Sequence, residues 1–191
     1  MPEKKSGLKT GMKVLIAIIV LVVAVAALFI SYNNRFVRGD ESIKQAWAQV
    51  QTQYQRRADL IPNLVETVKG YAAHEESVLM EITGMRSRYG EASTPEEYEK
   101  VDQDFQRAIN IVVEAYPELK ANENFLALQA ELAGTENRIA VARKDFNDQV
   151  ASYNKSVRTF PGSFFANLFG YEVRDMFQAQ PGSDTAPSIS F

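Results

Sequence analysis

Residues 125–156 read FLALQAELAGTENRIAVARKDFNDQVASYNKS, and this segment is the most regular part of the chain. One set of its side chains recurs at alternating steps of three and four residues, the spacing of one face of an α-helix. The stripe predicts one helix of about 36 residues, roughly 55 Å long. Its members are Phe125, Leu128, Leu132, Thr135, Ile139, Ala142, Phe146, Gln149, Tyr153 and Ser156.

The same spacing recurs upstream and predicts three further helices, over residues 40–59, 62–89 and 94–115. Asp40 is placed to cap the first of them. Thr94-Pro95-Glu96-Glu97 is a capping box with proline in the first turn, which is a helix-start signal. No segment alternates as a strand does. Four long helices with short connections indicate an all-α fold, an antiparallel up-and-down four-helix bundle over residues 33–177.

The first thirty residues differ from the rest of the chain. Residues 14–30 read VLIAIIVLVVAVAALFI, which is 17 residues without a polar side chain. As a helix this run is roughly 25 Å long, near the thickness of the apolar core of a bilayer. We therefore predict a transmembrane helix over residues 14–32, preceded by a basic segment over residues 1–13 and inserted in the lipid bilayer.

The residues within and beside the apolar run indicate whether it is cleaved or retained, and how it is oriented in the membrane. A cleaved secretory signal is the alternative to a retained anchor, because Ala24-Val25-Ala26 resembles a cleavage site. Four lysines precede the run and three basic residues follow it within about twenty residues, so the positive-inside rule favours a cytoplasmic N-terminus. We expect a single-pass protein of the cell (inner) membrane whose main domain lies outside the cytoplasm.

Composition excludes several classes of protein. The 191 residues include no cysteine and one histidine, which rules out disulfides, iron–sulfur clusters, thiolate zinc sites and any site built from two histidines. The net charge of −3 is unevenly distributed: residues 1–30 hold four lysines and one glutamate, whereas residues 31–191 hold 17 basic and 23 acidic side chains. An acidic main domain argues against nucleic acid as a partner.

The histidine does not complete a catalytic or metal-binding motif. An H-E-x-x-H zinc site starting at His74 would need a second histidine at position 78, where Val78 stands. A di-iron bundle would need Glu three residues before His74, where Tyr71 stands. We expect no catalytic residue, no metal and no cofactor, and so a protein that is not an enzyme; a hydrolase that uses His74 is the alternative.

An aromatic segment follows the last predicted helix. Residues 160–177 hold six aromatic side chains in eighteen residues, about three times the average density of the chain. One interpretation is a cap packed across the open end of the bundle, and the other is an interfacial or partner-docking element. The candidate interaction residues are Phe160, Phe164, Phe165, Phe169 and Tyr171. Residues 178–191 are polar and read as a disordered tail.

Two groups of polar residues are further candidates. A polar band near the predicted helix start at Pro62 is a possible contact surface, although helix-end capping and an ion pair also explain its arginines. Its members are Arg56, Arg57 and Glu66. A second group is expected to form a buried polar contact that sets helix register. Its members are Asn63, Asn137 and Arg138, and Gly134 beside them suggests a close helix approach.

Several long strings in this chain resemble signatures of the LemA family. They are AWAQV (46–50), QRRADLIPNLVETVKGY (55–71), LAGTENRIAVAR (132–143) and LFGY (168–171), and family members commonly have Phe where this chain has Tyr171. The resemblance covers about residues 30–178. It implies an N-terminal membrane anchor and a four-helix up-and-down bundle, and it implies no reaction, because the family has no established catalytic residues.

These observations favour a non-catalytic, membrane-anchored adaptor or scaffold for other membrane or envelope proteins. The partner is unknown, and a homo-oligomer is possible. The alternative is a self-assembling structural protein that shapes or organises the membrane.

Overall fold

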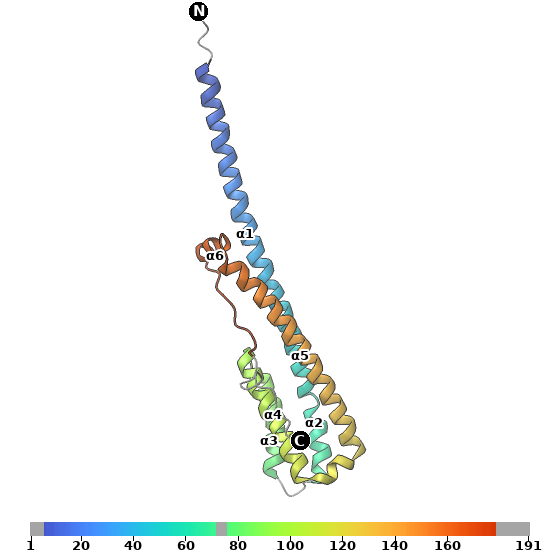
Figure 1. The fold of residues 1–191 in the computed structure, drawn as a ribbon. Coiled ribbons are helices and arrows are strands. Elements are labelled where there is room, and N and C mark those ends of the chain that lie inside the picture. The colour runs from blue at the N-terminus through green and yellow to red at the C-terminus, as the bar shows by residue number, and fades with distance from the viewer. Residues whose placement is uncertain (1–5, 72–75, 179–191) are drawn as a thin grey trace, which may run out of the picture. The chain divides into compact units, whose positions relative to one another are not determined.

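The computed structural model describes residues 6–71 and 76–178, and no strand occurs among them. The predicted all-α class is therefore confirmed. The elements, labelled in Figure 1, are α1 (Ser6–Ala58), α2 (Ile61–Lys69), α3 (Glu76–Glu91), α4 (Pro95–Ala115), the 3-10 helix η1 (Pro117–Ala121), α5 (Glu123–Arg158) and α6 (Gly162–Phe169).

The chain divides into two compact units, and each is described by itself. The anchor unit consists of Met1–Ser42 and Ala151–Arg174, and the bundle unit of Ile43–Val150 and Asp175–Phe191. The anchor unit contains the apolar part of α1, the end of α5, and α6. The bundle unit contains the end of α1, the whole of α2, α3, α4 and η1, and most of α5.

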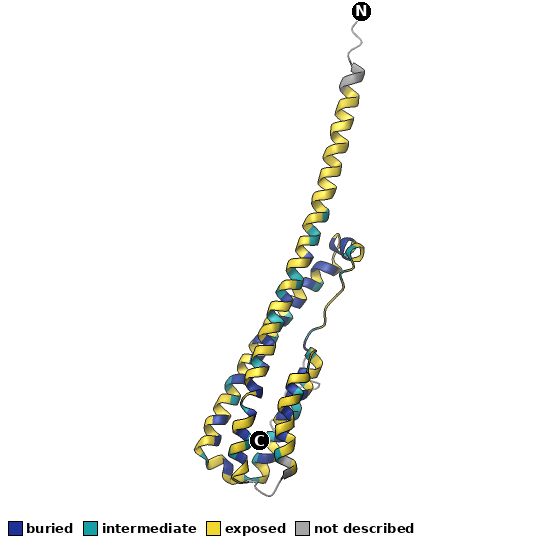
Figure 2. Ribbon diagram, turned by 180° about the vertical axis from the view of Figure 1, so that it is seen from behind, coloured by how far each residue is buried: buried dark blue, intermediate teal, exposed yellow. Residues whose placement is uncertain are grey.

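Helix α1 contains the predicted membrane span. Its N-terminal part is long and apolar enough to cross a membrane, and the side chains of residues 14–28 are exposed, as the yellow upper helix in Figure 2 shows. Length, composition and exposure thus agree with a transmembrane helix over residues 14–32. The expected orientation, with a cytoplasmic N-terminus, stays a prediction.

The expected helix start at Asp40 is wrong, because α1 runs without a break from Ser6 to Ala58. No proline interrupts it, and the glycine before Asp40 has a packing role instead. A Cβ at Gly39 would lie 2.8 Å from Cδ2 of Tyr153, so glycine leaves room for that ring. The Asp40 carboxylate accepts a hydrogen bond from Nη2 of Arg174 at 2.8 Å rather than capping a helix.

The expected single helix over residues 62–89 is also wrong, because this region forms two helices, α2 and α3. These helices contact each other, which one continuous helix could not do. Helix α2 ends before Gly70, a residue that costs helix stability relative to alanine. His74 lies outside the described residues, and so do 1–5 of the basic segment and 179–191 of the predicted tail.

Two local predictions are confirmed. The capping box begins α4: Thr94 Oγ1 accepts the Glu97 N–H at 3.2 Å, and Glu97 Oε2 accepts the Thr94 N–H at 3.1 Å. The Glu97 carboxylate also accepts the backbone N–H of Ser93, and these hydrogen bonds lower the pKa of Glu97. Helix α5 has the predicted length, 36 residues from Glu123 to Arg158.

The core of the bundle unit is built largely from the predicted stripes, although Gln149 of the α5 stripe is exposed, and Ile61 and Leu119, which lay outside the stripes, are buried. Tyr54 of α1 stacks between Tyr89 of α3 and Tyr98 of α4, with ring centroids 5.8 and 4.7 Å away. Aliphatic and aromatic side chains of the other helices surround this stack. Fully buried members of the core are Val50, Ile61, Leu64, Val68, Ile82, Met85, Phe105, Val112, Leu119, Phe125 and Ile139.

Candidate functional site

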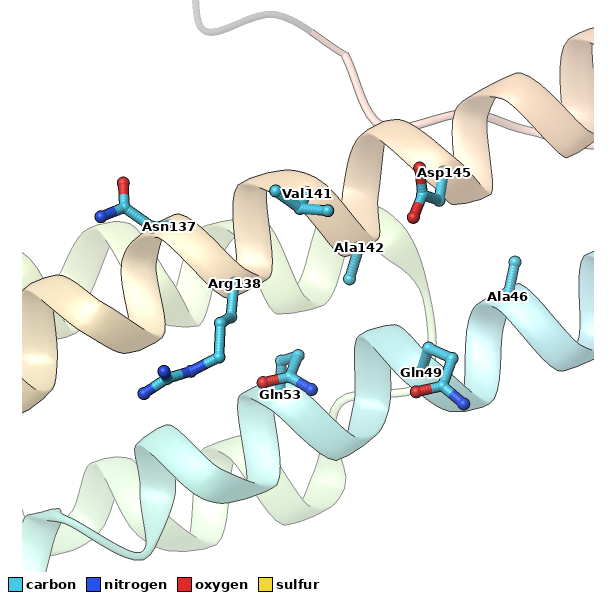
Figure 3. Close-up of a pocket in the computed structure, with 8 residues that line it drawn as sticks. All are labelled: Ala46, Gln49, Gln53, Asn137, Arg138, Val141, Ala142 and Asp145. Carbon is cyan, nitrogen blue, oxygen red and sulfur yellow. The ribbon is translucent and has the colours of Figure 1, made fainter.

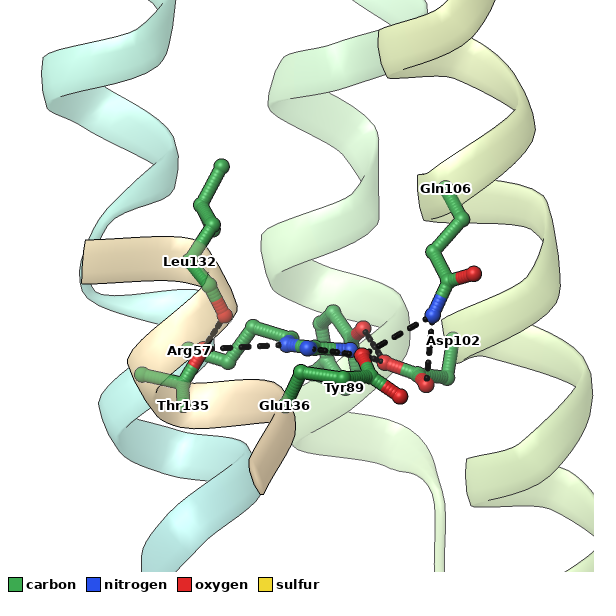
Figure 4. Close-up of polar contacts among 7 residues, drawn as sticks. All are labelled: Arg57, Tyr89, Asp102, Gln106, Leu132, Thr135 and Glu136. Atoms are coloured by element: carbon green, nitrogen blue, oxygen red, sulfur yellow. Dashed lines mark hydrogen bonds and ion pairs between the residues drawn. The ribbon is translucent and has the colours of Figure 1, made fainter. Parts of the chain in front are cut away.

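A buried polar network joins four helices of the bundle unit (Figure 4). Its centre is Arg57, in the last turn of α1, a residue that is only 2% exposed. The Arg57 guanidinium forms ion pairs with Asp102 of α4 and Glu136 of α5, and its Nε donates to Thr135 Oγ1 at 3.3 Å. Tyr89 of α3 donates its hydroxyl to Asp102 Oδ1 at 2.7 Å.

Two further contacts complete the network. Gln106, one turn after Asp102 on α4, donates from Nε2 to Glu136 Oε2 at 3.0 Å. The Thr135 hydroxyl accepts from Arg57 and donates to the backbone carbonyl of Leu132 at 2.7 Å. Because each buried charge has a partner of opposite charge, the network offsets the cost of removing these groups from water.

The pKa values of Arg57, of Tyr89 and of Tyr54, which stacks on Tyr89, are all raised. Burial alone lowers the pKa of Arg57, but attraction to Asp102 and hydrogen bonds to Glu136 and Asp102 outweigh it, so the pKa is raised. Burial, together with the charge of Asp102, raises the pKa of both Tyr89 and Tyr54. Arg57 therefore stays charged and both phenols stay neutral, which suits a structural role.

The raised tyrosine pKa values predict a loss of stability in alkali. Below about pH 10 these phenols are neutral in folded and unfolded chains alike, and above it only the unfolded chain ionises readily. The free energy of unfolding should then fall by about 1.4 kcal/mol per pH unit for each buried tyrosine. Urea denaturation across this range measures the slope.

A matched variant separates this effect from general alkaline damage. Tyr54 is buried and its hydroxyl has no hydrogen-bond partner within the described chain. Tyr54→Phe should therefore cost little stability at neutral pH. Above about pH 10 its free energy of unfolding should fall less steeply than that of the wild type, by about 1.4 kcal/mol per pH unit. An unchanged slope in Tyr54→Phe would show that Tyr54 does not contribute.

The expected contact surface of Arg56, Arg57 and Glu66 is wrong for Arg57. Arg56 and Glu66 are exposed, whereas Arg57 is buried. An ion pair, the other interpretation of the arginines, is what the structure shows for Arg57. A signal was available, since Arg57 lies three residues after Tyr54 and seven after Val50, on the apolar stripe of α1.

The expected buried register contact is wrong in its residues. Asn63, Asn137 and Arg138 are all exposed. Helix α5 instead turns Thr135 and Ile139 inward, so Asn137 and Arg138, which lie between them in the sequence, are on the exposed side of the helix. The buried polar contact between helices is made by the Arg57 network.

Gly134 does not mark a close approach of another helix. A Cβ at this position would lie 3.2 Å from Nη2 of Arg138, a side chain of the same helix. The missing side chain therefore makes room for the Arg138 guanidinium along the surface of α5.

A groove runs between α1 and α5 in the bundle unit (Figure 3). Its volume is about 510 Å³. The small residues Ala46 and Ala142, which are half-buried and buried, form part of its floor, and Val141 on the rim is 60% exposed. The lining residues are Ala46, Gln49 and Gln53 of α1 and Asn137, Arg138, Val141, Ala142 and Asp145 of α5.

Polar side chains are set along this groove. Gln49 and Gln53 lie along the α1 side, and Arg138 and Asp145 lie on the α5 side. Gln53 Oε1 is buried and accepts no hydrogen bond from the described residues. The groove thus offers apolar contact together with amide, cationic and anionic groups for a bound segment.

The aromatic segment forms α6, which packs on α1 inside the anchor unit. Phe165 is buried, with its ring 5.1 Å from Phe29 and stacked on Tyr32 at 4.6 Å. Phe169 and Tyr171 are half-buried, with Phe169 6.0 Å from Phe29. Phe160 and Phe164 are exposed. The five predicted interaction residues therefore divide into a packing set and an exposed set.

Two glycines allow α6 to pack in this way. A Cβ at Gly162 would lie 2.1 Å from the backbone oxygen of Ser156, so no other residue fits there without movement. Gly170 ends α6 with φ of 75°, a left-handed conformation that favours glycine. The N–H of Tyr171 then bonds to the carbonyl of Ala166 at 2.9 Å.

The end of the aromatic segment belongs to the bundle unit. Phe177 is buried against Trp47 and Phe146, with ring centroids 5.9 and 5.6 Å away. Asn147 holds the backbone of Phe177 at both its N–H and its carbonyl, each at 2.9 Å. The Arg143 guanidinium lies over the Phe177 ring, 4.6 Å from its centroid.

Comparison with known proteins gives a family and several relatives. The model of the LemA family matches residues 46–191. Magnetosome protein MamQ 2 of Paramagnetospirillum magneticum (strain AMB-1) is 26% identical over 199 residues, covering 89% of this chain and 73% of that protein. Magnetosome protein MamQ of Magnetospirillum gryphiswaldense is 25% identical over the same shares. Protein LemA of Metamycoplasma hominis is 24% identical over 163 residues, covering 82% of this chain and 74% of that protein.

Proposed function

The chain belongs to the LemA family, and we propose that it is a non-catalytic, single-pass membrane protein whose bundle unit acts as an adaptor or scaffold. In this proposal residues 14–32 hold the chain in the bilayer. The bundle unit binds another membrane or envelope protein. The two proteins meet on the side of the membrane where the bundle unit lies.

The observation that carries this proposal is the groove between α1 and α5. From Asn137 to Asp145 it extends over nine residues of α5, a rise of roughly 12 Å, which is the length of about two turns of helix. A partner helix with small or apolar residues on one face would fill the floor at Ala46 and Ala142. Its polar groups would meet Gln53 and Arg138 along the sides.

The buried Arg57 network supports the same proposal, because it fixes the two helices that line the groove relative to each other. A docking groove between two helices keeps its shape only if the helices hold a constant register. The network joins α1 and α5 directly, through Arg57, Thr135 and Glu136, beside the groove-lining residues of both helices. The groove therefore has a rigid frame.

Affinity capture with a matched pair of variants tests the proposal. Val141 and Ile111 are both exposed apolar residues, but Val141 lines the groove and Ile111 lies on α4 outside it. The tagged wild-type chain, crosslinked in native membranes before solubilisation, should capture a defined membrane or envelope protein. Val141→Arg should lose at least about nine-tenths of that protein, because burying an unpaired charge against a docked partner costs more than about 1.4 kcal/mol, which is a factor of ten in affinity.

The control is Ile111→Arg, which should capture as much of the partner as the wild type does. Equal capture by Val141→Arg and Ile111→Arg would remove the groove from the proposal. Both variants place the same charge at an exposed position, so a difference between them reports on the groove and not on folding.

A self-assembling protein that shapes or organises the membrane is the second candidate. The observation that favours it is the exposure of two aromatic side chains, Phe160 and Phe164, in and just before the helix that packs on α1 at Phe29. Capture of differently tagged copies of this chain, abolished by Phe160→Ser combined with Phe164→Ser, would support this candidate over the adaptor.

A further inference from the structure

Helix α6 has an exposed apolar face that the packing of the anchor unit leaves uncovered. Phe164 and Leu168 are 58% and 55% exposed, and they lie four residues apart on one side of the helix. Phe160, just before α6, is exposed as well. The opposite side of α6 is occupied, because Phe165 and Ala166 are buried.

The position of α6 along α1 is set by direct contacts. Phe165 and Phe169 both pack on Phe29, and Phe165 stacks on Tyr32, so α6 lies beside this turn of α1 (Figure 1). Phe29 is the penultimate residue of the apolar run that ends at Ile30. Helix α6 is therefore held at the end of the predicted membrane span.

The depth of that turn follows from helix geometry. An apolar core about 30 Å thick takes about 20 helical residues, close to the length of the predicted span over residues 14–32, and Phe29 is less than one helical turn from the end of that span. Phe29 then lies at the edge of the hydrocarbon region. Aromatic side chains concentrate at this depth in membrane proteins, since a ring is apolar but tolerates the headgroup region.

Basic side chains lie on α1 just after this turn and at the end of α5 just before α6. Arg35 and Arg38 follow on α1, and Lys155 and Arg158 lie in the last turn of α5, just before α6; all four are exposed. Such residues complement the phosphates of phospholipid headgroups. Helix α6 itself carries no charged side chain, so these neighbouring cations would supply the headgroup contacts that accompany its apolar face.

We propose that α6 lies in the membrane interface, with Phe160, Phe164 and Leu168 inserted between the headgroups and the upper acyl chains. This inference rests on the proposed membrane span and adds a second, peripheral contact with the same bilayer leaflet. It commits the exposed face of α6 to lipid, because α6 packs on Phe29, and the residues on either side of Phe29 in the span, Leu28 and Ile30, are exposed and apolar.

Site-directed spin labelling tests this inference, and the chain suits the method because it contains no cysteine. Single variants Phe164→Cys and Leu168→Cys are labelled in the full chain and reconstituted into vesicles of phosphatidylcholine and phosphatidylglycerol. Both side chains are exposed, so the packing of Phe165 on Phe29 is retained. Leu21→Cys is the control within the span, and Ile111→Cys is an exposed apolar control in the bundle unit.

The labels at positions 164 and 168 should be more accessible to oxygen than to a water-soluble nickel complex. Their depth should fall between that of the label at 21 and that of the label at 111. Labels at 164 and 168 that are as accessible to nickel as the label at 111 would overturn the inference. Labels protected from both reagents would also overturn it, since protein would then cover the face.

The same experiment separates this inference from the proposed function. If the label at 21 is in lipid and those at 164 and 168 are in water, the anchor stands and only the role of α6 fails. If the label at 21 is itself in water, the membrane span fails and the inference fails with it.

Discussion

Arg57→Met is expected to lower the free energy of unfolding by about 3–5 kcal/mol, because it leaves the buried Asp102 carboxylate without its cation. Methionine has similar length and fills much of the space of the arginine stem, so the loss reports mainly on charge and hydrogen bonding. Urea denaturation of the full chain in mild detergent measures it. Arg56→Met is the control, since Arg56 is adjacent but exposed, and it should change stability by less than about 0.5 kcal/mol.

A double variant tests whether the cost arises from an uncompensated charge. Arg57→Met combined with Asp102→Leu removes both members of the buried pair and should recover most of the lost stability. If the double variant is no more stable than Arg57→Met alone, the ion pair is not the cause of the loss. Glu136 can stay, because its half-exposed side chain turns to water.

Gly162→Ala is expected to release α6 from α1. The added methyl would lie 2.1 Å from the Ser156 carbonyl oxygen, and that backbone group cannot move without disturbing the end of α5. Overpacking of this kind costs about 1–3 kcal/mol, so opening of α6 should become at least about fivefold more frequent. Hydrogen exchange of the α6 amides, followed by mass spectrometry on the full chain, measures the opening.

A second glycine provides the control for this change. A Cβ at Gly84 in α3 would meet no neighbouring atom. Gly84→Ala should leave exchange in α6 unchanged and should stabilise α3 by up to about 1 kcal/mol. Unchanged protection of α6 in Gly162→Ala would show that this glycine is not needed for its packing.

The helical periodicity of the sequence was sufficient for the fold class, for α5 and for the capping box of α4. These features depend on residues close together in the chain, whose spacing or identity is visible directly. The break between α2 and α3 was missed because the apolar stripe continues across it. Only the contact between these two helices shows that the stripe covers two elements.

The polar sites were harder to predict for a physical reason. Whether an arginine is exposed or buried depends on partners from distant parts of the sequence, and Asp102 and Glu136 are 45 and 79 residues away from Arg57. The stripe position of Arg57 was the available signal. The groove between α1 and α5 has no signal of its own, since it arises from small residues on two helices that only the folded chain brings together.

The measurement that most directly tests the account is photo-crosslinking from inside the groove. A benzoylphenylalanine at position 141, in the full chain in native membranes, should yield one adduct of defined mass with another membrane or envelope protein. The same group at position 111 should not yield that adduct. No adduct from position 141, or the same adducts from both positions, would contradict the proposed scaffold.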